Sequence, residues 1–198
     1  MTRIIAGTAG GRRLTTAAGR TTRPTSDRAR EGLFSTVLAM RGGLAGAAAL
    51  DLYAGSGAVG LEALSRGATD VILVESDPRA AAVIRANIAS IGLAGARLLT
   101  GKVERVLAQG PDNGTRPRDF AFADPPYALP DAELEQVLAV LASTGWLAPG
   151  AVVAVERATR SGSPTWPEGL EPDRSRAYGE ATLWYGLAAG ALPVATAP

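Results

Sequence analysis

From residue 46 onward, short apolar runs alternate with stretches of helical periodicity. Five runs have the length of buried strands, at residues 48–53, 71–75, 96–99, 120–124 and 151–156. Between them apolar residues recur at helical spacing, as at Val83, Ile84 and Ile91. Strands that alternate with helices favour parallel pairing, right-handed crossovers and helices on both faces of the sheet. The chain is therefore predicted to form a doubly wound α/β sheet.

The two ends of the chain depart from this alternation. Residues 1–23 mix short apolar pieces with Gly, Thr and Arg, which predicts a basic arm or hairpin that adds nothing to the core. The main domain is expected over residues 24–189, beginning with a helix that starts at residues 24–27 and ends near Met40. Asp77 and Pro78 are expected to be the cap and first turn of a later helix. Residues 170–187 are strand-like around Tyr178, Gly179 and Glu180, which predicts a closing antiparallel hairpin. Residues 190–198 are predicted to be a disordered tail.

The composition excludes several kinds of chemistry. The chain has 198 residues, 46% of them hydrophobic, which suits one domain with a packed core. It has no Cys and no His, so a disulfide framework, a Cys/His zinc site, a cysteine nucleophile and a histidine base are all excluded. Carboxylates, hydroxyls, tyrosines and backbone groups remain, and no metal is expected. Since no apolar run approaches the ~20 residues of a membrane span, a soluble cytoplasmic protein is expected.

Positive charge is concentrated near the start of the chain. The first 31 residues hold seven arginines and two acidic residues, although the net charge of the whole chain is only +1. A basic head of this kind is typical of an arm that binds RNA or DNA. Biased composition is an equal alternative, because 19 of the 20 basic residues are Arg. The arginines predicted to contact nucleic acid are Arg3, Arg12, Arg13, Arg20, Arg23 and Arg28.

A glycine-rich turn follows the first strand of the alternating region. Gly55, Gly57 and Gly60 fit the G-x-G-x-x-G pattern at a strand-to-helix junction, where a nucleotide can approach the backbone. Glu75 ends the next strand, where a carboxylate can accept hydrogen bonds from ribose hydroxyls. NAD and S-adenosylmethionine both fit this pattern. Asp51 favours S-adenosylmethionine, because a carboxylate there would attract its cationic groups and repel a pyrophosphate. Further cofactor contacts are predicted from Tyr53, Ser56 and Ser76.

The fourth strand ends in Asp124-Pro125-Pro126-Tyr127, and this motif indicates a specific reaction. The two prolines hold the preceding residues extended and leave carbonyl groups as acceptors. An exocyclic amine of a nucleobase is a poor nucleophile, because its lone pair is delocalised into the ring. Asp124 and the Pro125 carbonyl can accept its two hydrogens and stabilise the charge that develops on nitrogen. Tyr127 can stack on the base. The alternative is an ordinary Pro-Pro turn.

Together these motifs resemble class I S-adenosylmethionine-dependent methyltransferases, and DPPY resembles the branch that modifies amino groups of bases. The segments RIIAG, RPTSDR, DLYAGSGAVGLEALSRGA, VE, DPPY and YGE, in this order, resemble the RsmD family. That family methylates N2 of guanine 966 in bacterial 16S ribosomal RNA. The resemblance implies a seven-stranded, mostly parallel sheet and a substrate in the assembled or assembling small ribosomal subunit. It also implies an adenine contact within residues 101–104, and Val103 is the residue predicted to make it. A monomer is expected.

Two other functions remain open at this point. An adenine-N6 DNA methyltransferase would use the same DPPY chemistry, although no separate DNA-recognition domain is evident in 198 residues. A noncatalytic RNA-binding factor for ribosome assembly could keep the fold without turnover, although Asp124 and Tyr127 disfavour it.

Overall fold

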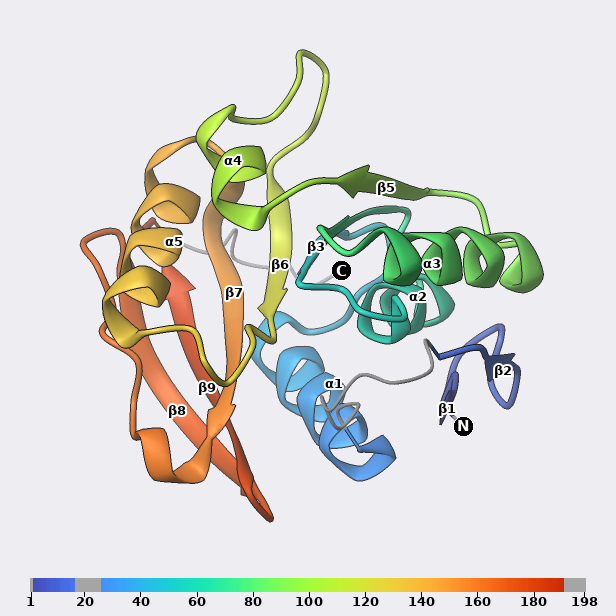
Figure 1. Cartoon of the computed structure of the whole chain (residues 1–198), viewed down its shortest axis with the longest axis horizontal. Coiled ribbons are helices and arrows are strands. Elements are labelled where there is room, and N and C mark those ends of the chain that lie inside the picture. Colours follow the sequence, from blue (N-terminus) through green and yellow to red (C-terminus); the bar gives the residue numbers. More distant parts are fainter. Residues whose placement is uncertain (1, 17–25, 191–198) are drawn as a thin grey trace, which may run out of the picture.

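The computed structural model describes residues 2–16 and 26–190, and its centre is a seven-stranded sheet (Figure 1). The strands lie in the order β5–β4–β3–β6–β7–β9–β8. The five that correspond to the apolar runs are β3 (Ala48–Leu52), β4 (Asp70–Glu75), β5 (Ala96–Thr100), β6 (Arg118–Ala123) and β7 (Leu147–Ala158). These five pair in parallel, which confirms the predicted doubly wound sheet.

The order of the strands places a crevice at the middle of the sheet. From β3 the chain moves outward to β4 and β5, and then returns to β6 on the other side of β3. The connections after β3 and after β6 therefore leave in opposite directions. In doubly wound sheets, ligands bind at the carboxyl ends of the strands at such a switch point.

The last two strands form the predicted antiparallel hairpin. β8 (Leu170–Tyr178) and β9 (Ala181–Ala188) are joined through Gly179, whose φ of 66° suits a tight turn. β9 lies between β7 and β8 and is antiparallel to both. β7 is longer than its apolar run predicts, because pairing with β9 extends it through Arg157 to Ala158. A 3₁₀ turn, η1 (Thr159–Ser161), follows it.

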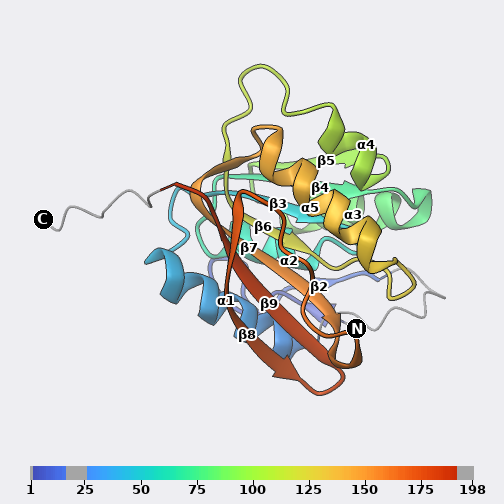
Figure 2. The same ribbon diagram turned by 90° about the vertical axis from the view of Figure 1, so that its left-hand side faces the viewer.

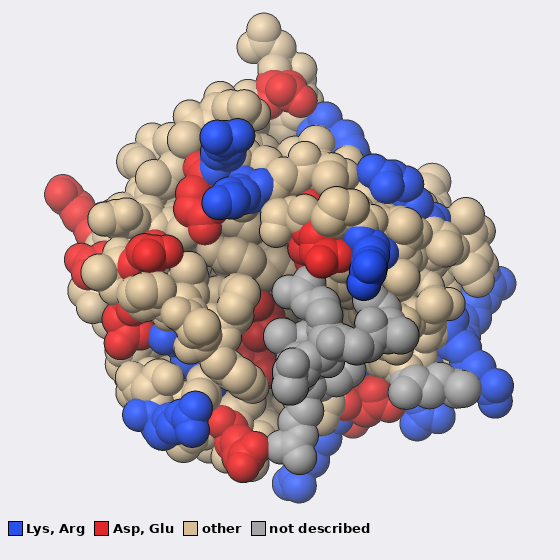
Figure 3. Space-filling view, viewed as in Figure 1, with Lys and Arg blue, Asp and Glu red and all other residues tan. Residues whose placement is uncertain are grey.

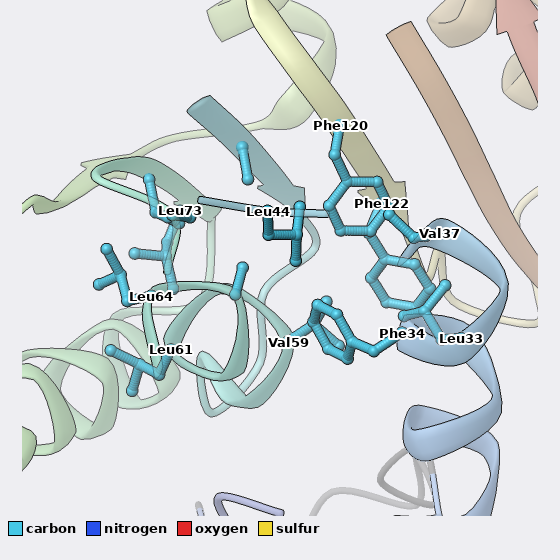
Figure 4. Packing of buried hydrophobic residues seen from close by; sticks show 14 of the residues in the cluster. Leu33, Phe34, Val37, Leu44, Val59, Leu61, Leu64, Leu73, Phe120 and Phe122 are labelled. Carbon is cyan, nitrogen blue, oxygen red and sulfur yellow. The ribbon is translucent and has the colours of Figure 1, made fainter. Parts of the chain in front are cut away.

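Helices cover both faces of the sheet (Figure 2). One face packs against α1 (Asp27–Arg41), α2 (Ala58–Ser65) and α3 (Pro78–Ile91), and the other against α4 (Val103–Ala108) and α5 (Asp131–Ser143). Successive strand residues point to opposite faces. Phe120 and Phe122 accordingly belong to the first core cluster (Figure 4), whereas Ala121 and Ala123 belong to the second.

Local sequence signals set where two helices begin. The Ser26 side chain accepts a hydrogen bond from the Ala29 amide at 3.1 Å and caps α1. Asp77 caps α3 by accepting from the Ala80 amide at 2.8 Å, with Pro78 at the first helical position. The predicted starts of both helices are confirmed, and α1 ends at Arg41, one residue beyond the expected position.

The N-terminal segment contributes to the core, and the prediction that it would not is wrong. β1 (Thr2–Arg3) and β2 (Arg13–Leu14) form a two-residue antiparallel ladder. Ile4 and Leu14 are buried in the same cluster as α1 and α2. The predicted arm continues into residues 17–23, which lie outside the described residues, as do residues 191–198 of the predicted tail. None of the helices in the described ranges is long and apolar enough to span a membrane.

Candidate cofactor and base-binding site

A cavity of about 580 Å³ opens at the carboxyl ends of β3, β4 and β6. Its volume lies within the range of ordinary ligand sites, roughly 300–1,000 Å³. Nine residues predicted from the sequence line it: Asp51, Tyr53, Gly55, Ser56, Glu75, Ser76, Val103, Asp124 and Pro126. The cofactor motif and part of the DPPY motif therefore meet at one cavity.

The three glycines of the turn have different surroundings. Gly55 has a φ of 59° and lines the cavity. Gly57 also has a positive φ, 77°, but a Cβ there would lie 3.0 Å from Leu73 of the core. Gly60 is similarly close to Leu73, at 2.9 Å. Gly57 and Gly60 therefore let α2 lie close to β4 and do not line the cavity, so the prediction of a cofactor contact by Gly57 has no direct support from the geometry.

Backbone amides hold the Glu75 carboxylate in place. Oε2 accepts from the Gly55 amide, and Oε1 accepts from the amides of Ser76 and Asp77, each at 2.8 Å. The side chain is buried yet lines the cavity. An acidic side chain at the end of the strand that follows the glycine turn is suited to accept hydrogen bonds from ribose hydroxyls.

Asp51 lies beneath the glycine turn. Its Oδ2 accepts a hydrogen bond from the Gly60 amide at 2.8 Å, and the residue is 3% exposed. Burial, together with the negative charge of Glu75, raises the pKa of Asp51 to about 8 against the opposing effect of the Gly60 hydrogen bond. A buried acid with a raised pKa at a cavity wall would be stabilised in its ionised form by a cationic ligand.

The DPPY motif is divided between the cavity wall and its surroundings. Asp124 and Pro126 line the cavity, and the Asp124 amide lies 3.4 Å from the Leu52 carbonyl oxygen of β3. Pro125 is buried and does not line it. Tyr127 is 47% exposed and lies outside the cavity lining. The structure thus brings Asp124 to the cofactor motif but leaves Tyr127 at the surface.

The segment predicted to contact an adenine supplies three neighbouring residues to the cavity wall, Lys102, Val103 and Glu104. Tyr53, which has an unusual φ of 60°, donates from its hydroxyl to Glu104 Oε1 at 3.4 Å. Burial and the adjacent Glu104 carboxylate raise the pKa of the Tyr53 hydroxyl, so this group stays protonated and acts as a donor.

Comparisons with known proteins agree with this geometry. The family model described as Conserved hypothetical protein 95 matches residues 2–186. Ribosomal RNA small subunit methyltransferase D of Escherichia coli K12 is 36% identical over 178 residues, which cover 90% of this chain and 85% of that protein. The protein of the same name from Haemophilus influenzae is 35% identical over 159 residues, 78% of this chain and 77% of its own.

The chain belongs to the RsmD family. Solved structures agree: Escherichia coli yhhF has a TM-score of 0.82 and 34% identity, with 96% of this chain and 99% of that chain covered. The Thermus thermophilus protein TTHA0928 has a TM-score of 0.77 and 32% identity, covering 93% and 98%. The chain is therefore a methyltransferase with a class I fold.

In this RsmD-family chain, several cavity residues have no local sequence signal. Among them are Thr16 and Arg30, with Glu133 from the first turn of α5. Arg30 is 1% exposed, and burial lowers the pKa of its guanidinium against the opposing charges of Glu62 and Asp27. Only tertiary structure brings these residues to the cavity. The apolar face of α1 indicates the burial of position 30 but not its partners.

Arg30 and Glu62 attach the N-terminal segment of this family member to its body. Arg30 donates to the Thr2 hydroxyl at 3.0 Å and to the Arg3 carbonyl oxygen. Glu62, fully buried on α2, accepts from the amides of Ile5 and Ala6 at 2.6 and 2.9 Å. The segment is thus held by buried charged groups, which cost several kcal/mol to leave unpaired.

The arginines predicted to bind nucleic acid differ in what they contact. Arg3 lies 3.5 Å from Asp27, and Arg12 donates to the Ile91 carbonyl oxygen at 2.7 Å. Arg13 and Arg28 are exposed. Arg20 and Arg23 lie outside the described residues. Basic side chains gather on the side of the molecule that carries β1 and β2, and a few acidic side chains lie in and beside the central hollow (Figure 3).

Proposed function

We propose that this chain transfers a methyl group from S-adenosylmethionine to the exocyclic N2 amine of guanine 966 in 16S ribosomal RNA. The observation that carries the proposal is that Asp124 lines the same cavity as Asp51 and Glu75. One cavity thus joins a site suited to a nucleotide cofactor with an acceptor for an amine. The names of the relatives from Escherichia coli and Haemophilus influenzae support small-subunit ribosomal RNA as the substrate.

The residues of the cavity fit S-adenosylmethionine. Glu75 would accept hydrogen bonds from the ribose hydroxyls, and Asp51 would face the cationic part of the molecule. Gly55 and Ser56 would border it at the turn, with Tyr53 and Ser76 beside them and Val103 against the adenine. When bound, S-adenosylmethionine supplies an electrophilic methyl group. Among the described residues, no group of acidic side chains is arranged to hold a metal ion, and the proposed reaction requires none.

The protein's own contribution is to orient and polarise the amine. Asp124 and the Pro125 carbonyl would accept the two hydrogens of N2, which turns the nitrogen lone pair away from the base ring and toward the methyl group. As nitrogen would form its bond to the methyl carbon, the bond from that carbon to sulfur would break and leave S-adenosylhomocysteine. Positive charge would pass to the nitrogen, where the Asp124 carboxylate would stabilise it. Water finally takes the proton. Holding both partners in one cavity supplies the remaining acceleration.

The guanine must leave its stack to reach Asp124. Bases within helices hide their Watson–Crick edges, so enzymes that modify them act on looped-out or flipped nucleotides. Tyr127, exposed beside the cavity, would stack on such a base, with Pro126 forming the adjacent wall. The basic side chains near β1 and β2 would contact the RNA backbone. We propose that the chain acts as a monomer on the assembled or assembling small subunit in the cytoplasm.

The test is methyl transfer to small subunits from a strain that lacks this modification, with a radiolabelled methyl group and mass-spectrometric location of the product. We expect label at guanine N2. Asp124→Ala should lower the rate by at least about 100-fold, since it removes a group that acts on the developing charge. The Kd for S-adenosylhomocysteine should change by less than about threefold, because the cofactor residues are intact.

A matched control is Asp112→Asn, which changes a carboxylate whose side chain is 77% exposed and which does not line the cavity. This variant should transfer methyl groups at the parent rate. Label on adenine N6 would show that guanine N2 is not the target. Tight binding to the subunits without any transfer would indicate a noncatalytic assembly factor.

A further inference from the structure

Arg157 is a buried arginine whose partners follow the DPPY motif directly. It is the last residue but one of β7, and its side chain is 5% exposed. Its Nη2 lies 2.7 Å from Asp131 Oδ1 and 3.3 Å from the Leu129 carbonyl oxygen. Leu129 lines the cavity, and Asp131 begins α5. One guanidinium nitrogen therefore contacts both the end of the motif loop and the start of the next helix.

The motif loop, residues 124–130, is attached to the body near its two ends. At its start, Asp124 follows β6 directly and its amide approaches β3. Toward its end, the Leu129 amide donates to the Pro126 carbonyl oxygen at 2.8 Å and closes a turn. Pro130, the N-cap of α5, provides no side-chain cap. The Arg157 contacts thus fix the turn that carries the exposed Tyr127.

Burial makes this arrangement depend on arginine in particular. Within the described residues, Arg157 Nε and Nη1 are buried without a hydrogen-bond partner, so Asp131 and Leu129 are the acceptors that compensate the buried charge. The planar guanidinium presents its donors in a fixed fork, whereas a lysine ammonium is a single point charge on a flexible stem. Lysine would keep the charge but would not hold the loop in the same geometry.

We propose that Arg157 is a positioning residue for methyl transfer: it anchors the loop that carries Pro125, Pro126 and Tyr127, and thereby sets the place of the target base. This inference rests on the proposed function. Misplacement of a reacting group by about 1 Å lowers rates by about 100-fold. The Arg157 contacts do not include the cofactor motif, so their loss should affect transfer and leave cofactor binding unchanged.

The experiment compares Arg157→Met and Arg157→Lys with a matched control, Arg118→Met. Arg118 is also a buried guanidinium, 2.9 Å from Asp70, but it lies at the amino end of β6, away from the cavity. Three quantities are measured: hydrogen exchange of the Leu129 amide, the Kd for S-adenosylhomocysteine, and the single-turnover transfer rate per folded molecule at saturating RNA.

We expect Arg157→Met to lower the transfer rate by about 10- to 100-fold and to speed exchange at Leu129, with the Kd changed by less than about threefold. Arg157→Lys should recover part of the rate. Arg118→Met should lose stability but keep the parent rate. A folded Arg157→Met variant with the parent rate overturns the inference.

If Arg157→Met does not fold, Asp131→Asn replaces it, because the Asp131 side chain is 63% exposed and its loss removes the charged acceptor. A several-fold lower transfer rate is then expected, and an unchanged rate overturns the inference. The activity of the parent protein distinguishes a failure of the proposed function from a failure of this inference. An inactive parent overturns the proposed function and with it this inference, whereas an active parent beside fully active variants overturns the inference alone.

Discussion

Asp51 gives the protein a pH dependence that comes from a single residue. Its pKa is about 8 in the folded chain, mainly because of burial, and 3.8 is the ordinary value. The folded state therefore binds a proton more tightly than the unfolded state between about pH 4 and pH 8. The contribution of Asp51 to the free energy of unfolding is greatest below pH 4 and is lost as the pH rises to 8.

Asp51→Asn should remove this pH dependence, because asparagine carries no charge and its amide oxygen can still accept from the Gly60 amide. In urea unfolding from pH 5 to 8, the free energy of unfolding of the variant should rise relative to that of the parent by up to about 1 kcal/mol per pH unit. S-adenosylmethionine should bind the variant about tenfold more weakly, since one charge pair is lost. Asp112→Asn is the exposed control. Parallel stability curves for Asp51→Asn and the parent would contradict the prediction.

Asn87 on α3 forms hydrogen bonds to both the N-terminal segment and the glycine turn. Its Oδ1 accepts from the Thr15 amide, and its Nδ2 donates to the carbonyl oxygens of Thr15 and Ser56, all at 2.9 Å. The residue is 2% exposed. It thus joins the N-terminal segment to the glycine turn, and both Thr16 and Ser56 line the cavity.

Asn87→Ala should lower the free energy of unfolding by about 2–4 kcal/mol, because buried backbone groups lose their partners. It should also raise the Kd for S-adenosylhomocysteine, since two segments of the cavity wall lose their common support. Urea unfolding and calorimetric titration measure the two effects. Asn113→Ala, at an exposed asparagine, is the control and should behave like the parent. A variant that is less stable but keeps the parental affinity would show that Asn87 does not support the cofactor site.

Local patterns predicted the elements that have a periodic or capping signal. The five parallel strands, the closing hairpin and the caps at Ser26 and Asp77 follow from residues close together in the chain. The N-terminal segment has no such signal, because a two-residue ladder is too short to show alternation. Its burial of Ile4 and Leu14 depends on distant partners, chiefly Glu62 on α2.

The same distinction holds for the candidate site. The glycine turn, Glu75 and Asp124 are marked by motifs that end strands, so the topology of the sheet was enough to bring them together. Thr16 and Glu133 come to the cavity from elements without a motif. The exposure of Tyr127 depends on how the loop after β6 leaves the sheet, which the local sequence does not determine.

At the scale of the whole molecule, the cavity wall is acidic, whereas basic side chains gather beside β1 and β2 on the face seen in Figure 3. The cavity wall holds five acidic residues, Asp51, Glu75, Glu104, Asp124 and Glu133, and two basic side chains, Arg30 and Lys102. Such a cavity favours a cationic cofactor and repels phosphates, so an RNA backbone is expected to stay outside it. The exposed arginines near the N-terminus would hold the backbone while a base enters.

Arg13 and Arg28 are the residues with which to test this division, because both are exposed, whereas Arg12 also supports α3 through Ile91. Arg13→Gln combined with Arg28→Gln should weaken binding to 16S RNA and reduce the slope of log K against log salt by about 1 to 2, according to how many phosphates the two side chains neutralise. Cofactor affinity should not change. Arg116→Gln removes a half-exposed charge before β6, at the amino ends of the parallel strands, and should leave the slope as it is. If the double variant keeps the parental slope, the RNA backbone lies elsewhere, and these two arginines are ordinary solvated surface residues.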